Sequence, residues 1–280
     1  MKGKARAFSV DLMKGERVLG QRSIPTAEVM DLAGGFSEAH HYGTSIFDPL
    51  LCELIYRWFC PTGGAVLDPF AGGSVRGIVA ACLGFKYTGV DLSAGQLAAN
   101  EVQAREILRG QRTRKPRWIV GDSRDLQKLV RGQFDLVFSC PPYADLEVYS
   151  DDPADISNMA FPDFLRAYQE IIKAACAMLK PDRFAVFVIG DVRDKRGFYR
   201  KLPWLTIEAF EKCKVYLYNE AVLVTAFGSL PIRAGQQFRF RKLGKTHQNV
   251  LVFFNGDPRR IPAAFPELEF DPGIIESWMQ

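Results

Sequence analysis

The chain has 280 residues, of which 48% are hydrophobic, so it can fold as one large domain or two small ones around a substantial core. A net charge of +4 is mildly basic, which is compatible with a polyanionic partner but does not require one. No stretch approaches about eighteen apolar residues, and no apolar segment follows the charged N-terminus, so we expect neither a transmembrane helix nor a signal peptide.

The six cysteines are scattered and form no Cys-x-x-Cys pair, and the three histidines lie far from any paired cysteines. This spacing is typical of free, mostly buried thiols in a reducing compartment rather than of disulfides or a zinc site. We therefore expect a cytoplasmic protein that needs no metal ion and no membrane.

The first half of the chain shows alternating strands and helices. Residues 1–45 lack clear periodicity and are expected to form an arm with a short strand or two. A helix is predicted over 46–60, because apolar residues recur at helical spacing and Asp48-Pro49 supplies an N-cap and a first-turn proline. Strands are then predicted at 65–68, 86–91, 117–120 and 134–139, with helices through 78–83 and at 94–108.

The second half continues the sheet and then changes direction. The polar region 144–165 is interpreted as a loop. A helix at 164–179, a fully apolar strand at 184–189, a helix at 204–213 and two strands at 214–225 and 248–254 follow. The order predicts an α/β fold in which seven strands, mostly parallel and ending in a hairpin, lie between helices on both faces.

Acidic residues and glycines follow the first three predicted strands. The first strand runs into Asp68-Pro69-Phe70-Ala71-Gly72-Gly73-Ser74 (the glycine loop), the second ends at Asp91-Leu92, and the third is followed by Asp122-Ser123. The carboxyl ends of parallel strands share one edge of a sheet, where such folds bind ligands. Glycines allow a ligand close to the backbone, and carboxylates accept hydrogen bonds from ribose hydroxyls or an adenine amino group. The pattern predicts a nucleoside-like cofactor.

The fourth strand, 134–139, runs into Cys140-Pro141-Pro142-Tyr143 (the double-proline tip). Neither proline can donate a backbone N–H, so the ladder of the sheet must end here. The carbonyls of Cys140 and Pro141 are then fixed beside the ring of Tyr143. Rigid acceptors next to an aromatic ring suit a planar amino group, such as that of a nucleobase.

These two motifs carry a resemblance to a known family. The glycine loop resembles the cofactor motif of S-adenosylmethionine-dependent DNA amino-methyltransferases, and the double-proline tip resembles their catalytic (Asp/Asn/Ser)-Pro-Pro-(Tyr/Phe) motif. The continuation from Tyr143 to Tyr149 is most similar to the cytosine-N4 branch. Phe47-Asp48-Pro49 resembles the short motif that touches the methionine end of the cofactor, and the similarity covers roughly residues 45–255.

The resemblance implies a class I methyltransferase fold, Rossmann-like, with a catalytic domain at 46–256 between an N-terminal arm at 1–45 and a C-terminal tail at 257–280. It implies methyl transfer to the exocyclic amino group of a flipped base in double-stranded DNA, cytosine N4 preferred and adenine N6 next. The catalytic residues would be Cys140, Pro141, Pro142 and Tyr143. S-adenosylmethionine, with S-adenosylhomocysteine as product, would be bound by Phe47, Asp68, Pro69, Phe70, Ala71, Gly72, Gly73, Asp91, Leu92, Asp122 and Ser123.

Cys140 departs from the family pattern, which has Asp, Asn or Ser at this place. A thiol is a weaker acceptor than a hydroxyl, although nearly the same size as serine. One alternative is a cytosine-C5 methyltransferase with Cys140 as nucleophile, but enzymes of that class carry their cysteine after the double proline. Another is a relative that binds nucleotide or DNA without catalysis.

Short basic segments are the expected contacts to DNA phosphates. The candidate residues are Arg193, Lys195, Arg196, Arg233, Arg239, Arg241 and Lys242, which fall in the insertions 193–203 and 228–246. These two segments and the acidic segment 144–165 are the candidate target-contact insertions. The basic cluster from Arg105 to Arg117 is expected to be a solvated face. The candidate target-contact segments are short. Such short segments are associated with orphan methylases of phages or mobile elements, so a bacterial or phage source is expected. The recognition sequence, a homodimer and a cognate restriction nuclease are left open.

Overall fold

The computed structural model describes residues 8–14, 17–24, 47–143, 152–224, 237–265 and 267. They belong to two compact units, one within residues 1–47 and the other within residues 48–280. In the first unit, strands β1 (Phe8–Lys14) and β2 (Arg17–Ile24) pair antiparallel. The N-terminal segment therefore contains the short strands expected there.

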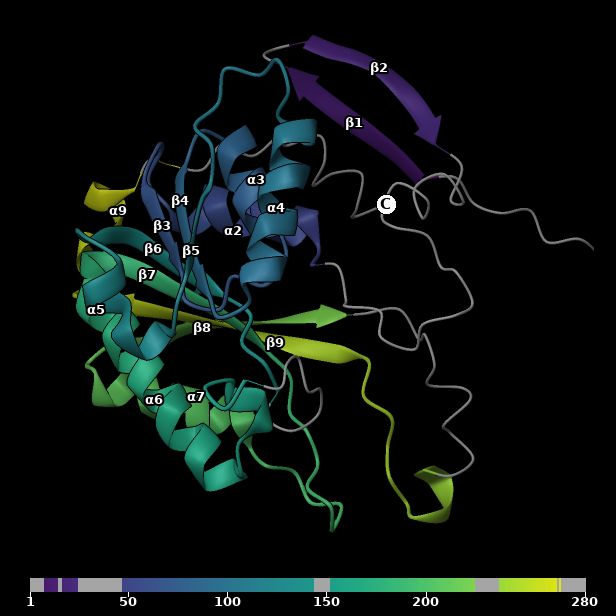
Figure 1. Ribbon diagram of the computed structural model, residues 1–280, viewed down its shortest axis with the longest axis vertical. Coiled ribbons are helices and arrows are strands. Elements are labelled where there is room, and N and C mark those ends of the chain that lie inside the picture. The colour runs from purple at the N-terminus through teal and green to yellow at the C-terminus, as the bar shows by residue number, and fades with distance from the viewer. Residues whose placement is uncertain are drawn as a thin grey trace, which may run out of the picture. The chain divides into compact units, whose positions relative to one another are not determined.

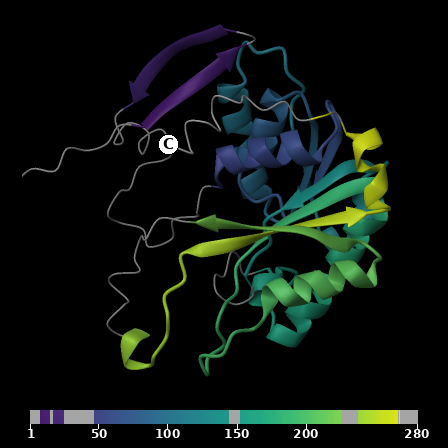
Figure 2. The ribbon, with the colours of Figure 1, turned by 180° about the vertical axis from the view of Figure 1, so that it is seen from behind.

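The second unit is built on one seven-stranded sheet with the strand order β5-β4-β3-β6-β7-β9-β8 (Figures 1 and 2). The first five strands of this order run parallel, and β9 runs antiparallel to both of its neighbours. The mixed seven-stranded sheet predicted from the sequence is confirmed. Its strands are β3 (Ala65–Asp68), β4 (Lys86–Asp91), β5 (Arg117–Val120), β6 (Phe134–Ser139), β7 (Leu179–Ile189), β8 (Tyr216–Val224) and β9 (His247–Asn255).

Helices cover both faces of this sheet (Figure 1). One face carries α2 (Pro49–Phe59), α3 (Val75–Cys82) and α4 (Ala94–Ile107). The other carries α5 (Leu126–Leu129), α6 (Phe161–Met178) and α7 (Leu202–Lys212). Short helical turns follow at Ser123–Asp125, Ile156–Asn158, Pro258–Arg260 and, as α9, Ile261–Ala264.

Local signals in the sequence account for several of these boundaries. Asp48 caps α2, since its carboxylate accepts from the N–H groups of Leu50 at 2.8 Å and Leu51 at 3.2 Å, and Pro49 opens the first turn. The predicted bounds of β3, β4, β5 and β6 agree with the structure residue for residue.

Two elements begin earlier than their apolar patterns predict. Helix α6 starts at Phe161 rather than at residue 164, because Pro162 in its first turn already favours the helical backbone. Strand β7 starts at Leu179 rather than at residue 184, and Arg183 pairs with Asn255 of β9. The first residues of β7 are mostly polar and partly exposed. A run of apolar residues therefore does not predict this part of the strand.

The core beside α6 and α7 is rich in aromatic side chains. Phe164 and Tyr168 are fully buried on one face of α6 and stack on each other, with ring centroids 5.6 Å apart. Phe210 of α7 stacks on Phe253 of β9 at 4.0 Å. This packing fixes the position of the sheet on which the candidate site is built.

Candidate functional site

Four parallel strands, β5, β4, β3 and β6, lie side by side in the sheet (Figure 1). Because they run parallel, their carboxyl ends share one edge. The glycine loop follows β3, Leu92 follows β4, residues 121–123 follow β5, and the double-proline tip follows β6. The fold thus gathers at one edge the motifs that the sequence keeps far apart.

Asp68, the last residue of β3, is fully buried and fixes the start of the glycine loop. Its Oδ2 accepts from Arg76 Nε at 2.6 Å and from the Tyr87 hydroxyl at 2.7 Å. Its Oδ1 accepts from the Ser139 hydroxyl at 2.5 Å and from the backbone N–H of Phe70 at 3.2 Å. Both oxygens accept hydrogen bonds from protein donors, and neither is exposed to a ligand. This carboxylate therefore stabilises the loop rather than binding a cofactor directly.

Arg76, in the first turn of α3, completes this buried arrangement and is only 5% exposed. Its guanidinium also donates to the carbonyls of Phe70 at 2.7 Å and Ala71 at 3.0 Å. Burial opposes the charge of Arg76, but the nearby Asp68 and further neighbours outweigh it and hold its pKa above the ordinary value. A permanently charged side chain therefore fixes the loop backbone.

Three further side chains hold the glycine loop from neighbouring elements. The Ser123 hydroxyl donates to the carbonyl of Pro69 at 2.6 Å. Asn100 of α4 donates to the carbonyl of Gly72 at 2.7 Å, and the Gly72 N–H donates to Asp91 Oδ2 at 2.9 Å. Gly72 has a φ of 47°, in the left-handed region that favours glycine. These hydrogen bonds fix the backbone of the loop.

The two other strand-end acids differ in how they are engaged. Asp91 accepts from the N–H groups of Gly72 and Ser93, each at 2.9 Å, and each of its oxygens keeps a second acceptor position. Burial raises the pKa of Asp91, and these two N–H groups oppose that shift. Burial also works against ionisation of Asp122, but Arg124 donates to both of its oxygens and brings the pKa of Asp122 below the ordinary value.

The double-proline tip starts beside the glycine loop. Strands β3 and β6 are neighbours, with Val66 opposite Leu136 and Leu67 opposite Val137. At their ends, Ser139 Oγ donates to Asp68 and also accepts from the Phe70 N–H at 3.2 Å. Cys140 follows Ser139 directly, so the tip and the loop leave the sheet from points in hydrogen-bond contact.

Tyr143 spans from β6 toward the ends of β7 and β9. Its hydroxyl accepts from Gln248 Nε2 of β9 at 2.5 Å and lies 3.7 Å from Cys140 Sγ. Its ring atoms come within 3.7 Å of where a side chain on Gly190, just after β7, would begin. The ring is half-buried and packs against the core, so its orientation is fixed by three strands.

The predicted site residues divide into a buried and an accessible group. The buried ones are Asp68, Pro69, Ala71, Ser123 and Pro141. The partly or fully accessible ones are Phe70, Gly72, Gly73, Asp91, Leu92, Asp122, Cys140, Pro142 and Tyr143. Phe47 is the last residue of the N-terminal unit, and its part in a site stays a prediction.

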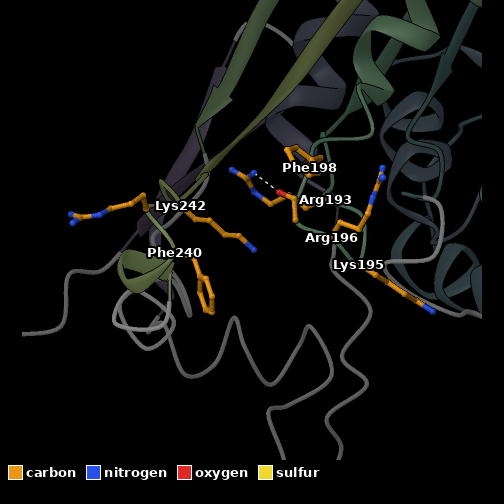
Figure 3. Close-up of a pocket in the computed structure, with 8 residues that line it drawn as sticks. Arg193, Lys195, Arg196, Phe198, Phe240 and Lys242 are labelled. Carbon is orange, nitrogen blue, oxygen red and sulfur yellow. Dashed lines mark hydrogen bonds between the residues drawn. The ribbon is translucent and has the colours of Figure 1, made fainter.

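Most of the predicted basic contacts gather around one hollow of about 540 Å³ (Figure 3). Figure 3 shows Phe240 and Lys242 on one side of this hollow and Arg193, Arg196 and Phe198 on the other. Two insertions predicted separately are thus brought face to face. Arg233 lies outside the described residues, and Arg239 does not line the hollow.

Sequence reasoning missed the residues that hold this site together. Arg76 binds Asp68 eight residues away, whereas Asn100, Ser139 and Gln248 bind site residues 28 to 105 residues away. Arg76 had a detectable signal, since a lone arginine follows the glycine loop in an otherwise apolar helix. The others show no pattern in one sequence, because their partners are set by the fold.

The six cysteines are free thiols; Cys52, Cys60 and Cys176 are buried, whereas Cys82 is exposed. Within the described ranges, no cluster of three or more His, Cys, Asp or Glu side chains could hold a metal ion. None of the helices described is long and apolar enough to cross a membrane.

Comparisons with known proteins identify the fold. The sequence matches no protein-family model, and a search of curated proteins finds no match at the significance required. Among solved structures, TrmN from Thermus thermophilus is similar with a TM-score of 0.52 and 17% identity over 75% of this chain, which spans only 49% of TrmN. A SAM-dependent methyltransferase from Methanosarcina mazei is similar with a TM-score of 0.51 and 14% identity, covering 76% of this chain and 100% of that one. Together with the strand order, these likenesses show that the chain has the Rossmann-like class I methyltransferase fold.

Proposed function

We propose that this protein transfers a methyl group from S-adenosylmethionine to the exocyclic amino group of a base in DNA, cytosine N4 first and adenine N6 second. The observation that carries the proposal is the contact between Ser139 and Asp68, which sets the double-proline tip beside the glycine loop. A donor held by the loop and an amino group held by the tip would then lie within reach of each other.

The accessible residues fit such a cofactor. The space beside Gly73 is open, because a side chain there would meet no atom within 4 Å. Asp91 retains acceptor positions that suit the ribose hydroxyls, and the half-buried Leu92 follows it as a face for the adenine. S-adenosylmethionine, when bound, supplies an electrophilic methyl group on a sulfonium centre. Asp68 and Arg76 would hold the glycine loop in place without contacting the cofactor.

We expect Gly73→Ala to weaken binding of S-adenosylmethionine by about 10-fold or more, because its methyl group would occupy space that the cofactor needs. The free energy of unfolding should stay unchanged, since the position is open. Calorimetric titration and urea unfolding measure the two quantities. Gly95→Ala, at an exposed glycine in α4 with equally open surroundings, is the control and should keep its cofactor affinity. Unchanged affinity in Gly73→Ala would argue against a cofactor at this loop.

The tip would activate the amino group by position and polarity. The nitrogen of such a group is a poor nucleophile because its lone pair is delocalised into the ring. Cys140 and the carbonyls of the tip would accept hydrogen bonds from its two N–H groups and favour a tetrahedral nitrogen, whose lone pair faces the loop. Tyr143, held by Gln248, would form the wall beside the base. In a duplex, the base must first leave the stack at a cost of a few kcal/mol.

There are two alternatives to this proposal, a cytosine-C5 enzyme and a relative without catalysis. In a cytosine-C5 enzyme, the thiolate of Cys140 would attack the ring. The place of Cys140 before the double proline, and its contact with the Tyr143 hydroxyl at 3.7 Å, favour a polar contact over nucleophilic attack. In a relative without catalysis, cofactor or DNA would bind without turnover. Asp91 and the tip favour an enzyme over this second alternative.

We expect Cys140→Ser to retain amino methylation and Cys140→Ala to reduce it by about 10-fold, the range for one lost polar contact. Nucleoside mass spectrometry of DNA from expressing cells separates N4-methylcytosine, 5-methylcytosine and N6-methyladenine and checks both variants. Cys82→Ser, at an exposed thiol away from the tip, is the matched control. Formation of 5-methylcytosine that disappears in Cys140→Ser would replace this proposal with the C5 alternative.

A further inference from the structure

We infer that the hollow between residues 193–198 and residues 240–242 binds an unpaired strand of nucleic acid. The inference rests on the proposed function, because the strand bound here is the one that carries the target base. It adds that the protein grips this strand in single-stranded form rather than through duplex backbone alone.

The charge of the hollow suits a polynucleotide. Its charged lining residues are all cationic: Arg193, Lys195, Arg196, Arg241 and Lys242. Lys242 reaches across it, since its Nζ lies 3.0 Å from where a side chain on Gly197 would begin. A volume of about 540 Å³ is the size of a site for a small organic ligand such as a nucleotide. Such a cationic concavity attracts phosphate groups.

Two exposed aromatic rings distinguish this hollow from a simple phosphate site. Phe198 and Phe240 are each 68% exposed, although both are large and apolar. A cation lies near each ring: Arg196 Cζ is 5.7 Å from the centre of Phe198, and Lys242 Nζ is 5.7 Å from that of Phe240. Rings flanked by cations stack on bases while the cations contact phosphates. Bases inside a duplex are already stacked on each other, so this arrangement favours an unpaired strand.

Hydrogen bonds within the loop hold the backbone around Phe198. Asp194 accepts the Phe198 N–H at 2.9 Å and the backbone groups of the same two residues bond at 2.8 Å. Arg193 donates to the Gly197 carbonyl at 2.8 Å, as the dashed line in Figure 3 marks, and its guanidinium lies 3.9 Å from the centre of the Tyr199 ring. A preformed platform loses little conformational entropy on binding.

Short segments of chain join both sides of the hollow to residues that contact Tyr143. Arg193 follows Gly190, which lies against the Tyr143 ring, and Lys242 precedes Gln248, which binds its hydroxyl. Each connection is a few residues long, and a chain spans at most about 3.5 Å per residue. The Cα atom of Arg193 therefore lies at most about 11 Å from that of Gly190, and the Cα atom of Lys242 at most about 21 Å from that of Gln248, so a strand bound in the hollow can extend to the double-proline tip.

The test is equilibrium binding of a fluorescent oligonucleotide of about 12 nucleotides, within the span of known single-strand sites. Fluorescence anisotropy compares single-stranded DNA, single-stranded RNA of the same sequence and duplex DNA. We expect the double variant Phe198→Ala/Phe240→Ala to bind a single strand about 10-fold or more weakly and the duplex within about 2-fold of the unaltered protein. Trp204→Ala, at an aromatic residue 62% exposed on α7 and outside the hollow, should change neither.

A second variant tests the charges. Lys195→Ala/Arg196→Ala/Lys242→Ala should lower the slope of log affinity against log salt by about 2 for a single strand, at about 0.7 per lost phosphate contact. Arg109→Ala/Arg112→Ala/Arg114→Ala removes the same charge from exposed positions that do not line the hollow and should leave most of the slope intact. Equal losses in the two triple variants would overturn the inference.

The outcomes separate this inference from the proposed function. Equal losses for duplex and single strand in the phenylalanine variant, or no loss for either, would overturn the inference while leaving methyl transfer untouched. A normal affinity of that variant for S-adenosylmethionine, with circular dichroism unchanged, shows that the fold and cofactor site are intact. A loss of single-strand binding alone in the phenylalanine variant would support the inference. If the unaltered protein also bound single-stranded RNA much more tightly than single-stranded DNA, this would contradict DNA as the substrate.

Discussion

Asp68→Ala is expected to lower the free energy of unfolding by about 3–5 kcal/mol, the usual cost of removing one partner of a buried ion pair. Arg76 would keep its charge in a place that is only 5% exposed. The hydroxyls of Tyr87 and Ser139 would also lose their acceptor. Urea unfolding followed by circular dichroism measures the change. The glycine loop, which depends on Arg76, should lose its cofactor affinity at the same time.

A surface pair provides the control for this prediction. Asp163 pairs with Arg166 in the first turns of α6, where their side chains are 51% and 75% exposed. Asp163→Ala should therefore cost less than about 1 kcal/mol. The double variant Asp68→Leu/Arg76→Met should recover part of the loss, because it removes the buried charge as well. A cost below about 1 kcal/mol for Asp68→Ala would show that water reaches Arg76 and that the pair does not hold the loop.

Tyr143→Ala should reduce the rate of methyl transfer by about 100-fold, within the range for losing one aromatic stacking surface together with its positioning. Tyr143→Phe keeps the ring and loses the hydroxyl contacts, including those with Gln248 and Cys140, so its rate should fall by less than about 10-fold. Single-turnover transfer from labelled S-adenosylmethionine to DNA measures the rate. Calorimetry on the same variants shows whether cofactor binding is unchanged.

Tyr216 offers a matched control for the second prediction. It is a tyrosine of β8 that is 56% exposed, and strands β7 and β9 lie between β8 and β6, which carries the double-proline tip. Tyr216→Ala should transfer methyl groups at the unaltered rate. A Tyr143→Ala protein as active as Tyr216→Ala would remove the tip from the mechanism. If weaker cofactor binding fully explained the lower rate of Tyr143→Ala, Tyr143 would contribute to binding the cofactor rather than the target base.

Local patterns in the sequence were sufficient for the sheet and its motifs. Strands β3, β4, β5 and β6 are predicted at their observed bounds, because each is a short run containing β-branched or aromatic residues, with a glycine, a proline or an acid within two residues of its end. The start of α2 was equally legible, since Asp48 and Pro49 act within one turn. Alternation of the elements then gave the parallel sheet covered on both faces, which the structural comparisons confirm.

Contacts between distant segments were decided only by the tertiary structure. Asp68 was expected to face a cofactor, and it lies beneath the loop, bound to Arg76 and to Ser139, which is 71 residues away. The partner of Tyr143 lies 105 residues along the chain, in a strand that turns antiparallel. The hollow lies between two insertions, and nothing in the sequence of either one predicts that it faces the other. Periodicity and caps act within a few neighbouring residues, so the sequence alone determined the elements and the order of the motifs. Side-chain partners depend on strand order and register, which arise only when the whole core packs, so the folded chain decided what holds the site and what faces it.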